Sequence, residues 1–132
     1  MELIQEYSHT VSALGGMALL LLVQLLIADI IGIRRRHTPG SPVAADHSNL
    51  LFRASRAVAN TNESIAVFIL AVLFCILSQA SPACTAYAAW GFVLSRAIYA
   101  VLYYGNLQTP RSVLFGVSIL FIVALLILGF SA

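Results

Sequence analysis

Four long apolar stretches constrain the fold of this chain more than any other feature of its sequence. They cover residues 11–33, 57–77, 83–104 and 113–130. Each is close to the ~20 residues that a helix needs to cross a bilayer core of about 30 Å. The chain is 61% hydrophobic and only 9% charged, whereas soluble domains carry about 25% charged residues. A water-soluble domain of 132 residues could not bury so much apolar surface. The sequence therefore predicts an integral membrane protein.

The predicted fold class is all-α, with one membrane domain over residues 1–132. The expected helices lie at about 10–33, 49–78, 82–104 and 110–131. The last two connections are short, so successive helices should be antiparallel neighbours in a four-helix bundle. The acidic N-terminus and the lack of a small-residue cleavage site favour a retained first helix over a signal peptide. Helix-start residues are expected within 46–49, at Ser81-Pro82 and at Thr109-Pro110.

Arginine placement predicts how the bundle is oriented. The first loop contains Arg34, Arg35 and Arg36, and the third contains Arg111, while the loop at residues 78–82 has no basic residue. The positive-inside rule therefore places loops 1 and 3 in the cytoplasm and both termini outside. The formal charge of +2 is explained by these orientation signals, and no nucleic-acid partner is expected.

The cysteines and histidines form no recognisable site. Cys75 lies well inside the second span and Cys84 near the start of the third, so filling of the core or of an interface is favoured over a disulfide. The three histidines show no ligand spacing with cysteine or aspartate, and no metal is expected.

The second helix carries a polar stripe. Arg53, Arg56, Asn60 and Glu63 are spaced 3, 4 and 3 residues apart, which places them on one helix face. The apolar segment at residues 64–79 extends only about 24 Å, so Glu63 should lie inside the membrane. A charge there costs roughly 2.5 kcal/mol or more if it faces lipid. The stripe must therefore face protein or a hydrated cavity.

The third helix has a matching stripe, formed by Arg96, Tyr99 and Tyr103. Arg96 should lie about 20 Å from the helix start, close to the depth of Glu63. We therefore expect an ion pair between Glu63 and Arg96, which could serve ligand binding or only lock the bundle.

Arginines outnumber acids at this end of the predicted bundle. The arginines are Arg53, Arg56, Arg96 and Arg111, and the acids are Glu63 and Asp29. Asp29 is expected to neutralise a neighbouring arginine. Guanidinium groups bind carboxylates through paired hydrogen bonds. The pattern thus predicts a pocket for a small, multiply carboxylated ligand, open to the cytoplasm and to lipid.

Three segments follow patterns of a known family. Residues 53–63 read R-x-x-R-A-x-x-N-x-x-E, residues 96–103 read R-x-x-Y-x-x-x-Y, and residues 109–112 read T-P-R-S. Together they resemble the signatures of the MAPEG family, the membrane-associated proteins of eicosanoid and glutathione metabolism. The resemblance covers nearly the whole chain. The short loops favour a bacterial member in the inner membrane, whereas a eukaryotic one would lie in the endoplasmic reticulum.

The resemblance implies a homotrimer with glutathione, the co-substrate, bound at subunit interfaces. Arg111 matches the arginine that faces the glutathione sulfur, and would be catalytic. Arg34 is similar to an arginine that reaches across from a neighbouring subunit. The residues implied in glutathione binding are Arg34, Arg53, Arg56, Asn60, Glu63, Arg96, Tyr99, Tyr103 and Ser112. Tyr99 stands where prostaglandin E synthases carry histidine, so a transferase or a leukotriene-synthase-like pattern is favoured.

The implied chemistry is the activation of a thiol. Lowering a thiol pKa near 8.5 by about two units requires about 2.7 kcal/mol. One guanidinium at ~4 Å supplies on the order of 4 kcal/mol at an effective dielectric of 20, so Arg111 alone could suffice. The predicted function is a glutathione transferase, or a peroxidase, acting on small hydrophobic electrophiles from the bilayer. The alternatives are a non-catalytic lipid-binding or scaffold member and, less favoured, a proton-coupled exporter.

Overall fold

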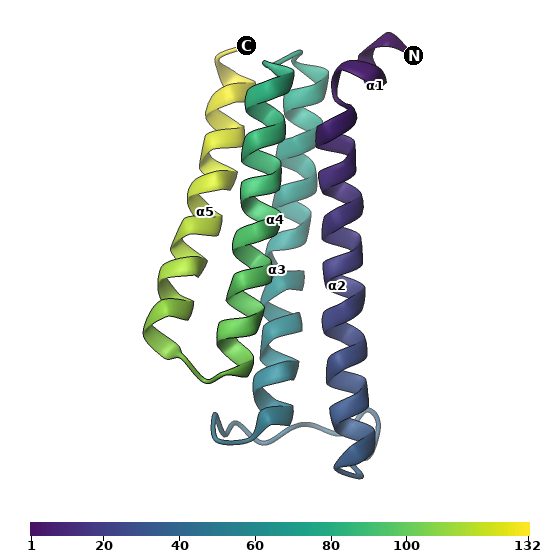
Figure 1. Ribbon diagram of the computed structural model, residues 1–132, viewed down its shortest axis with the longest axis vertical. Coiled ribbons are helices and arrows are strands. Elements are labelled where there is room, and N and C mark those ends of the chain that lie inside the picture. Colours follow the sequence, from purple (N-terminus) through teal and green to yellow (C-terminus); the bar gives the residue numbers. More distant parts are fainter.

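The computed structural model describes all 132 residues, and every regular element is helical (Figure 1). The elements are α1 (Glu2–Glu6), α2 (Ser8–Arg34), α3 (Leu50–Leu77), α4 (Pro82–Tyr104) and α5 (Gln108–Phe130). The last four are long and apolar enough to cross a membrane, which confirms the predicted all-α fold of an integral, multi-pass membrane protein. The short helix α1 was not expected from the sequence.

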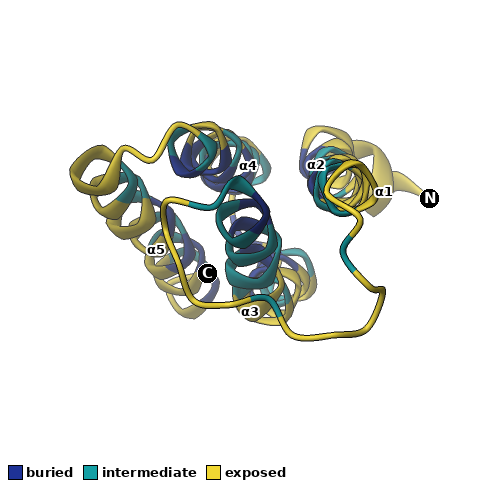
Figure 2. Ribbon diagram, turned by 90° about the horizontal axis from the view of Figure 1, so that it is seen from below, coloured by how far each residue is buried: buried dark blue, intermediate teal, exposed yellow.

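Each of the four long helices runs antiparallel to the one that follows it in the chain. Both termini lie at one end of the bundle, and the long loop 35–49 and the turn between α4 and α5 lie at the other (Figure 1). Seen along the bundle, α3 and α4 form its middle, α2 packs on one side of them and α5 on the other (Figure 2). The outward faces of α2 and α5 are largely exposed apolar side chains, as expected where the solvent is lipid.

The core lies toward the end that carries the termini. Phe68 of α3 and Phe92 of α4 are fully buried and stack with their ring centroids 4.3 Å apart. Cys75 is also buried, and its thiol donates to the carbonyl of Leu125 over 3.0 Å, so it fills the core as predicted. Cys84 is free and exposed on α4, and its place at an interface stays a prediction.

Local capping explains where the helices begin. Asn49 accepts a hydrogen bond from the Leu51 amide over 3.0 Å at the start of α3, and Ser81 caps α4 with Pro82 directly after it. For Thr109-Pro110 the expected proline near the helix start is confirmed, because Pro110 lies in the first turn of α5, but the expected cap is wrong, because α5 already begins at Gln108 and has no side-chain cap. Proline is accepted within this first turn because amides there have no acceptor inside the helix.

Candidate functional site

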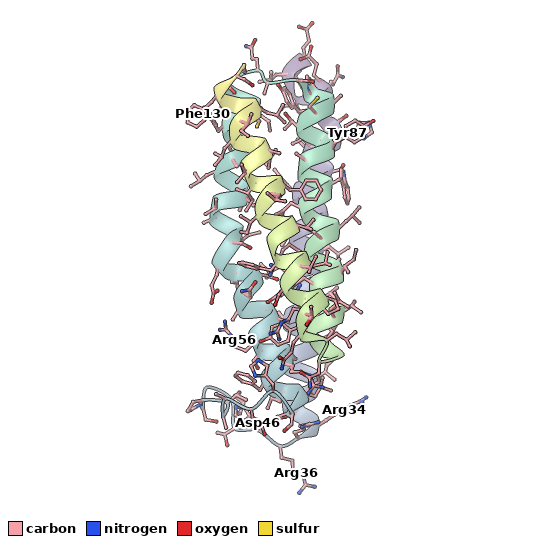
Figure 3. The ribbon with its side chains drawn as sticks, turned by 90° about the vertical axis from the view of Figure 1, so that its left-hand side faces the viewer. Arg34, Arg36, Asp46, Arg56, Tyr87 and Phe130 are labelled. Atoms are coloured by element: carbon pink, nitrogen blue, oxygen red, sulfur yellow. The ribbon has the colours of Figure 1, made fainter.

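A polar cavity of about 210 Å³ lies between α3, α4 and α5, toward the end of the bundle opposite the termini. Figure 3 shows Arg34, Arg36, Asp46 and Arg56 near this end, and Tyr87 and Phe130 at the other. The residues that line the cavity are Arg56, Asn60, Tyr99, Tyr103, Arg111, Ser112 and Phe115. Six of the ten residues predicted for the site therefore meet at one place.

The helical repeat explains how these side chains converge. Arg56 and Asn60 are four residues apart on α3, and Tyr99 and Tyr103 are four apart on α4. Side chains four residues apart share a helix face, so each helix presents two of its polar groups to the same cavity. The first turns of α5 close the third side with Arg111 and its neighbours.

Aromatic rings hold Arg111 in place. The carbon at the centre of its guanidinium lies 4.2 Å from the centroid of the Tyr103 ring, which is a cation–π contact. Tyr99 meets the same ring edge to face, with centroids 5.7 Å apart. Arg111 Nη1 is buried and has no hydrogen-bond partner within the chain. No acidic side chain pairs with Arg111, so its positive charge at the cavity wall is uncompensated.

Arg96 lies behind the cavity and is completely buried. Its Nη2 donates to Asn60 Oδ1 over 2.7 Å and to Thr61 Oγ1 over 3.1 Å, and its guanidinium covers the Tyr99 ring at 4.2 Å. Arg96 therefore orients two cavity residues, Asn60 and Tyr99, and does not line the cavity itself.

The predicted ion pair between Glu63 and Arg96 is wrong. Glu63 pairs instead with Arg56, with Oε1 and Nη2 3.7 Å apart. At about 100° per residue, Thr61 and Glu63 point to opposite sides of α3, so a guanidinium that bonds Thr61 cannot reach Glu63. Arg56 lies two turns from Glu63 on the same face. This pair lies at the surface of the single chain, since the Glu63 side chain is 61% exposed.

Arg53 and Arg34 lie outside the cavity of the single chain. Arg53 Nε donates to the Tyr104 carbonyl over 3.2 Å, and Nη1 donates to the His47 carbonyl over 2.7 Å. Arg53 thereby joins the start of α3 to the end of α4 and to the loop that precedes α3. Arg34 is exposed at the end of α2, and its reach into a neighbouring subunit stays a prediction.

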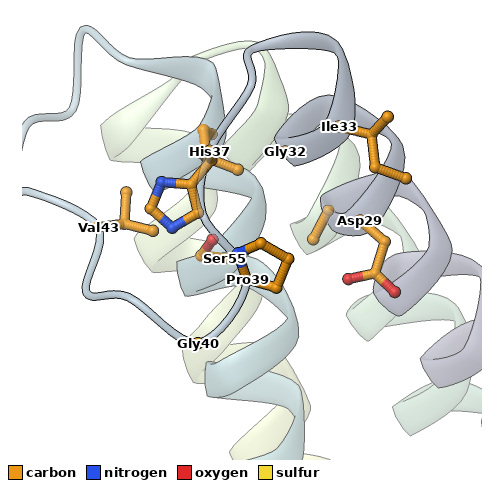
Figure 4. Close-up of a pocket in the computed structure, with 10 residues that line it drawn as sticks. Asp29, Gly32, Ile33, His37, Pro39, Gly40, Val43 and Ser55 are labelled. Carbon is orange, nitrogen blue, oxygen red and sulfur yellow. The ribbon is translucent and has the colours of Figure 1, made fainter.

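A larger cavity, of about 450 Å³, lies beneath the loop between α2 and α3 (Figure 4). Its polar lining consists of Asp29, His37 and Ser55. The expectation that Asp29 neutralises an arginine is wrong, because no arginine nitrogen lies within ion-pair distance of its carboxylate. None of the predicted site residues lines this cavity. The concentration of cationic and phenolic groups makes the smaller cavity the better candidate for chemistry.

Two residues that contact the site were missed from the sequence. Phe115 lies one turn after Arg111 and lines the cavity, so the helical repeat of α5 could have indicated it. His47 Nε2 lies 3.3 Å from the Tyr103 hydroxyl, but it belongs to a loop, where no periodic pattern marks a residue that contacts the site.

A comparison with protein families now bears on this arrangement. The profile of the MAPEG family matches residues 12–131. The chain belongs to the MAPEG family. The match spans all four long helices, and it confirms the resemblance based on the three motifs. No curated protein matches the chain. MAPEG proteins generally use glutathione and are typically trimers. They include glutathione transferases and peroxidases, and some members are non-catalytic.

Proposed function

We propose that this MAPEG protein is a membrane-bound glutathione transferase that joins the glutathione thiolate to hydrophobic electrophiles from the bilayer. A glutathione-dependent peroxidase activity would use the same thiolate. The observation that carries the proposal is the geometry of Arg111, whose Nη1 has no partner within the chain while its guanidinium rests on Tyr103 beside an open polar cavity.

The groups around the cavity suit the polar ends of glutathione. The tripeptide has two carboxylates and one ammonium group. The Arg56 guanidinium can donate two parallel hydrogen bonds to a carboxylate. Glu63, which pairs with Arg56, can accept a hydrogen bond from the ammonium group. Asn60, Tyr99, Tyr103 and Ser112 add neutral hydrogen-bonding groups. These side chains would hold the tripeptide with its sulfur toward Arg111.

The size of the cavity supports a site shared between subunits. It measures about 210 Å³, below the ~300–1,000 Å³ typical of small-molecule sites. A second copy of the chain, with Arg34 at the end of its α2, would enlarge and close the site. We therefore infer a homotrimer with glutathione at the interfaces. We also place loops 1 and 3, and with them the cavity, on the cytoplasmic side, because the arginines gather at that end.

The proposed reaction is a nucleophilic substitution. The thiol loses its proton to water, and the sulfur anion is stabilised by the guanidinium of Arg111. The anion then forms a carbon–sulfur bond to the electrophile. With chlorodinitrobenzene, the carbon–chlorine bond breaks and chloride leaves with the bonding electron pair. The thiolate, not the thiol, is the reactive nucleophile, so the arginine acts by raising the thiolate fraction.

The test is conjugation of chlorodinitrobenzene with glutathione by the purified protein. We expect the wild type to form the thioether and, at a pH below both thiol pKa values, Arg111→Ala to lose about 100-fold in rate, because two pKa units of thiol activation disappear. Arg36→Asn is the matched control, since it removes an exposed arginine from the same end and suits the backbone φ of 54° there. Full activity in a trimeric Arg111→Ala would contradict the catalytic assignment.

Glutathione binding separates this function from the non-catalytic alternative. If glutathione binds the folded protein, a 100-fold excess over its Kd should add about 2.7 kcal/mol of stability, seen as a rise in Tm in detergent. A protein that neither conjugates the substrate nor gains stability with glutathione would be a lipid-binding or scaffold member instead.

A further inference from the structure

His47, at the end of the loop between α2 and α3, contacts the site from outside the cavity. Its Nε2 lies 3.3 Å from the hydroxyl of Tyr103. The two rings are inclined by only 19°, with centroids 6.1 Å apart. Phe52 meets the imidazole edge to face at 5.0 Å. The imidazole therefore has both a hydrogen-bonding and a packing relation to a ring that lines the cavity.

The backbone of His47 is fixed by Arg53. This arginine donates from Nη1 to the His47 carbonyl over 2.7 Å and from Nε to the Tyr104 carbonyl over 3.2 Å. One guanidinium thus joins the loop to the residue that follows Tyr103 on α4. His47 and Tyr103 are held at a constant separation by the main chain as well as by their side chains.

Tyr103 connects this contact to Arg111. The Arg111 guanidinium lies 4.2 Å from the Tyr103 centroid, and Tyr103 itself is only 5% exposed. Two charged groups contact His47 and Tyr103: Arg53 bonds the His47 carbonyl, and Arg111 lies on the Tyr103 ring. The adjacent carboxylate, Asp46, is bonded to Ser48. A displacement of the Tyr103 ring would therefore move the surface on which Arg111 rests.

We propose that His47 is a positioning residue that, through Tyr103, fixes the distance between the Arg111 guanidinium and the glutathione sulfur. This inference rests on the proposed function. Coulomb attraction falls inversely with distance, so moving the guanidinium from ~4 to ~5 Å weakens it by about a fifth. At an effective dielectric of 20 this raises the thiol pKa by about 0.6, which lowers the thiolate fraction about fourfold at a pH below that pKa. Loss of His47 should therefore weaken thiol activation more than glutathione binding.

The experiment is a double-mutant cycle on the glutathione-saturated protein. His47→Phe keeps an aromatic ring and removes the imidazole nitrogens, while Tyr103→Phe removes the hydroxyl that they contact. The readouts are the pKa of the bound thiol, from the ultraviolet absorbance of the thiolate against pH, and kcat separately from KM for glutathione. His37→Phe is the matched control, because the His37 side chain contacts only Ser41 of the same loop through hydrogen bonds.

We expect His47→Phe to raise the pKa of the bound thiol and, at a pH below that pKa, to lower kcat about three- to tenfold, the range of one hydrogen bond. KM for glutathione should change less than kcat. In the Tyr103→Phe background the same substitution should have little further effect, since coupled groups are non-additive. A direct electrostatic effect of the imidazole would persist in that background.

The outcomes separate the two proposals. If the wild type neither conjugates the substrate nor binds glutathione, the proposed function fails and the role of His47 fails with it. If the wild type is active but the two substitutions add independently, or leave the thiol pKa unchanged, only the role of His47 is overturned. Should His47→Phe fail to form the trimer, His47→Leu, which also offers no hydrogen-bonding group, replaces it in the cycle, and the same comparison of thiol pKa decides.

Discussion

The buried guanidinium of Arg96 predicts an asymmetry between two substitutions. Arg96 is 0% exposed, and its Nη2 bonds Asn60 and Thr61 while Nε and Nη1 have no acceptor within the chain. We expect Asn60→Leu to destabilise the bundle and Arg96→Met to have little effect or to stabilise it. The first change leaves a buried charge with fewer partners, whereas the second removes the charge.

The geometry sets the size of this difference. The bond from Nη2 to Asn60 Oδ1 is short, at 2.7 Å, and is charge-assisted, so its loss should cost about 1.5–3 kcal/mol. The bond to Thr61 Oγ1 is longer, at 3.1 Å, and Thr61→Val should cost about 0.6 kcal/mol, the average for polar contacts between membrane helices. Replacing a whole buried ion pair by apolar side chains of similar volume is often neutral or stabilising by about 1–4 kcal/mol, because no buried charge remains. Arg96→Met also leaves no buried charge, since both partners of Arg96 are neutral and Asn60 lies at the open cavity. The expected order of stability is Arg96→Met, then Thr61→Val, then Asn60→Leu.

The assay is unfolding of the purified variants in detergent, without glutathione so that altered ligand binding does not contribute. Each variant is compared with the wild type at one protein concentration, since the stability of an oligomer such as the proposed trimer depends on concentration. An Arg96→Met variant that loses more stability than Asn60→Leu would refute the reasoning. It would mean that the hydrogen bonds of Arg96 outweigh the cost of burying its charge.

Two further predictions concern packing and pH. Gly91→Ala should destabilise the bundle by about 1–3 kcal/mol, because a Cβ there overlaps the Phe121 ring, whereas Gly116→Ala meets nothing within 4 Å and should be neutral or slightly stabilising; equal Tm values for the pair would contradict this. In the loop between α2 and α3, hydrogen bonds from the Ser48 hydroxyl and backbone amide lower the pKa of the Asp46 carboxyl. These bonds therefore stabilise the fold above the ordinary carboxyl pKa, and the stabilisation is lost as pH falls through the lowered pKa of Asp46. Ser48→Ala should raise the Asp46 pKa toward its ordinary value in a carbon-detected NMR titration, and an unchanged pKa would show that the serine hydroxyl has no part in the shift.

The sequence alone was sufficient for the four long helices and for six of the seven residues that line the cavity. Hydropathy acts within each segment, so four spans could be identified without knowing how they pack. The helical repeat also acts within one segment, and it brought Arg56 and Asn60 to one face, and Tyr99 and Tyr103 to another. The spacing of these residues was what carried the family resemblance, which the match over residues 12–131 confirmed.

The pairing across helices was decided only by the tertiary structure. Depth along the membrane could be counted from the sequence, and it placed Glu63 and Arg96 at a similar level. The rotation of α3 about its own axis could not be predicted in this way. That rotation turns Asn60 and Thr61 toward α4, where they bond Arg96, and turns Glu63 away, so that Glu63 pairs with Arg56. Rotation is set by the packing of all neighbouring helices at once, so no single segment contains it.

The contact of His47 with Tyr103 has the same origin. These residues are 56 positions apart, and the path of the loop between them and the cavity depends on where α3 and α4 end relative to each other. Hydropathy and periodicity determined which side chains each helix offers, because both are properties of a single helix in lipid. Which of those side chains meet, and which loop residue contacts them, was decided by the packing of four helices around a common core.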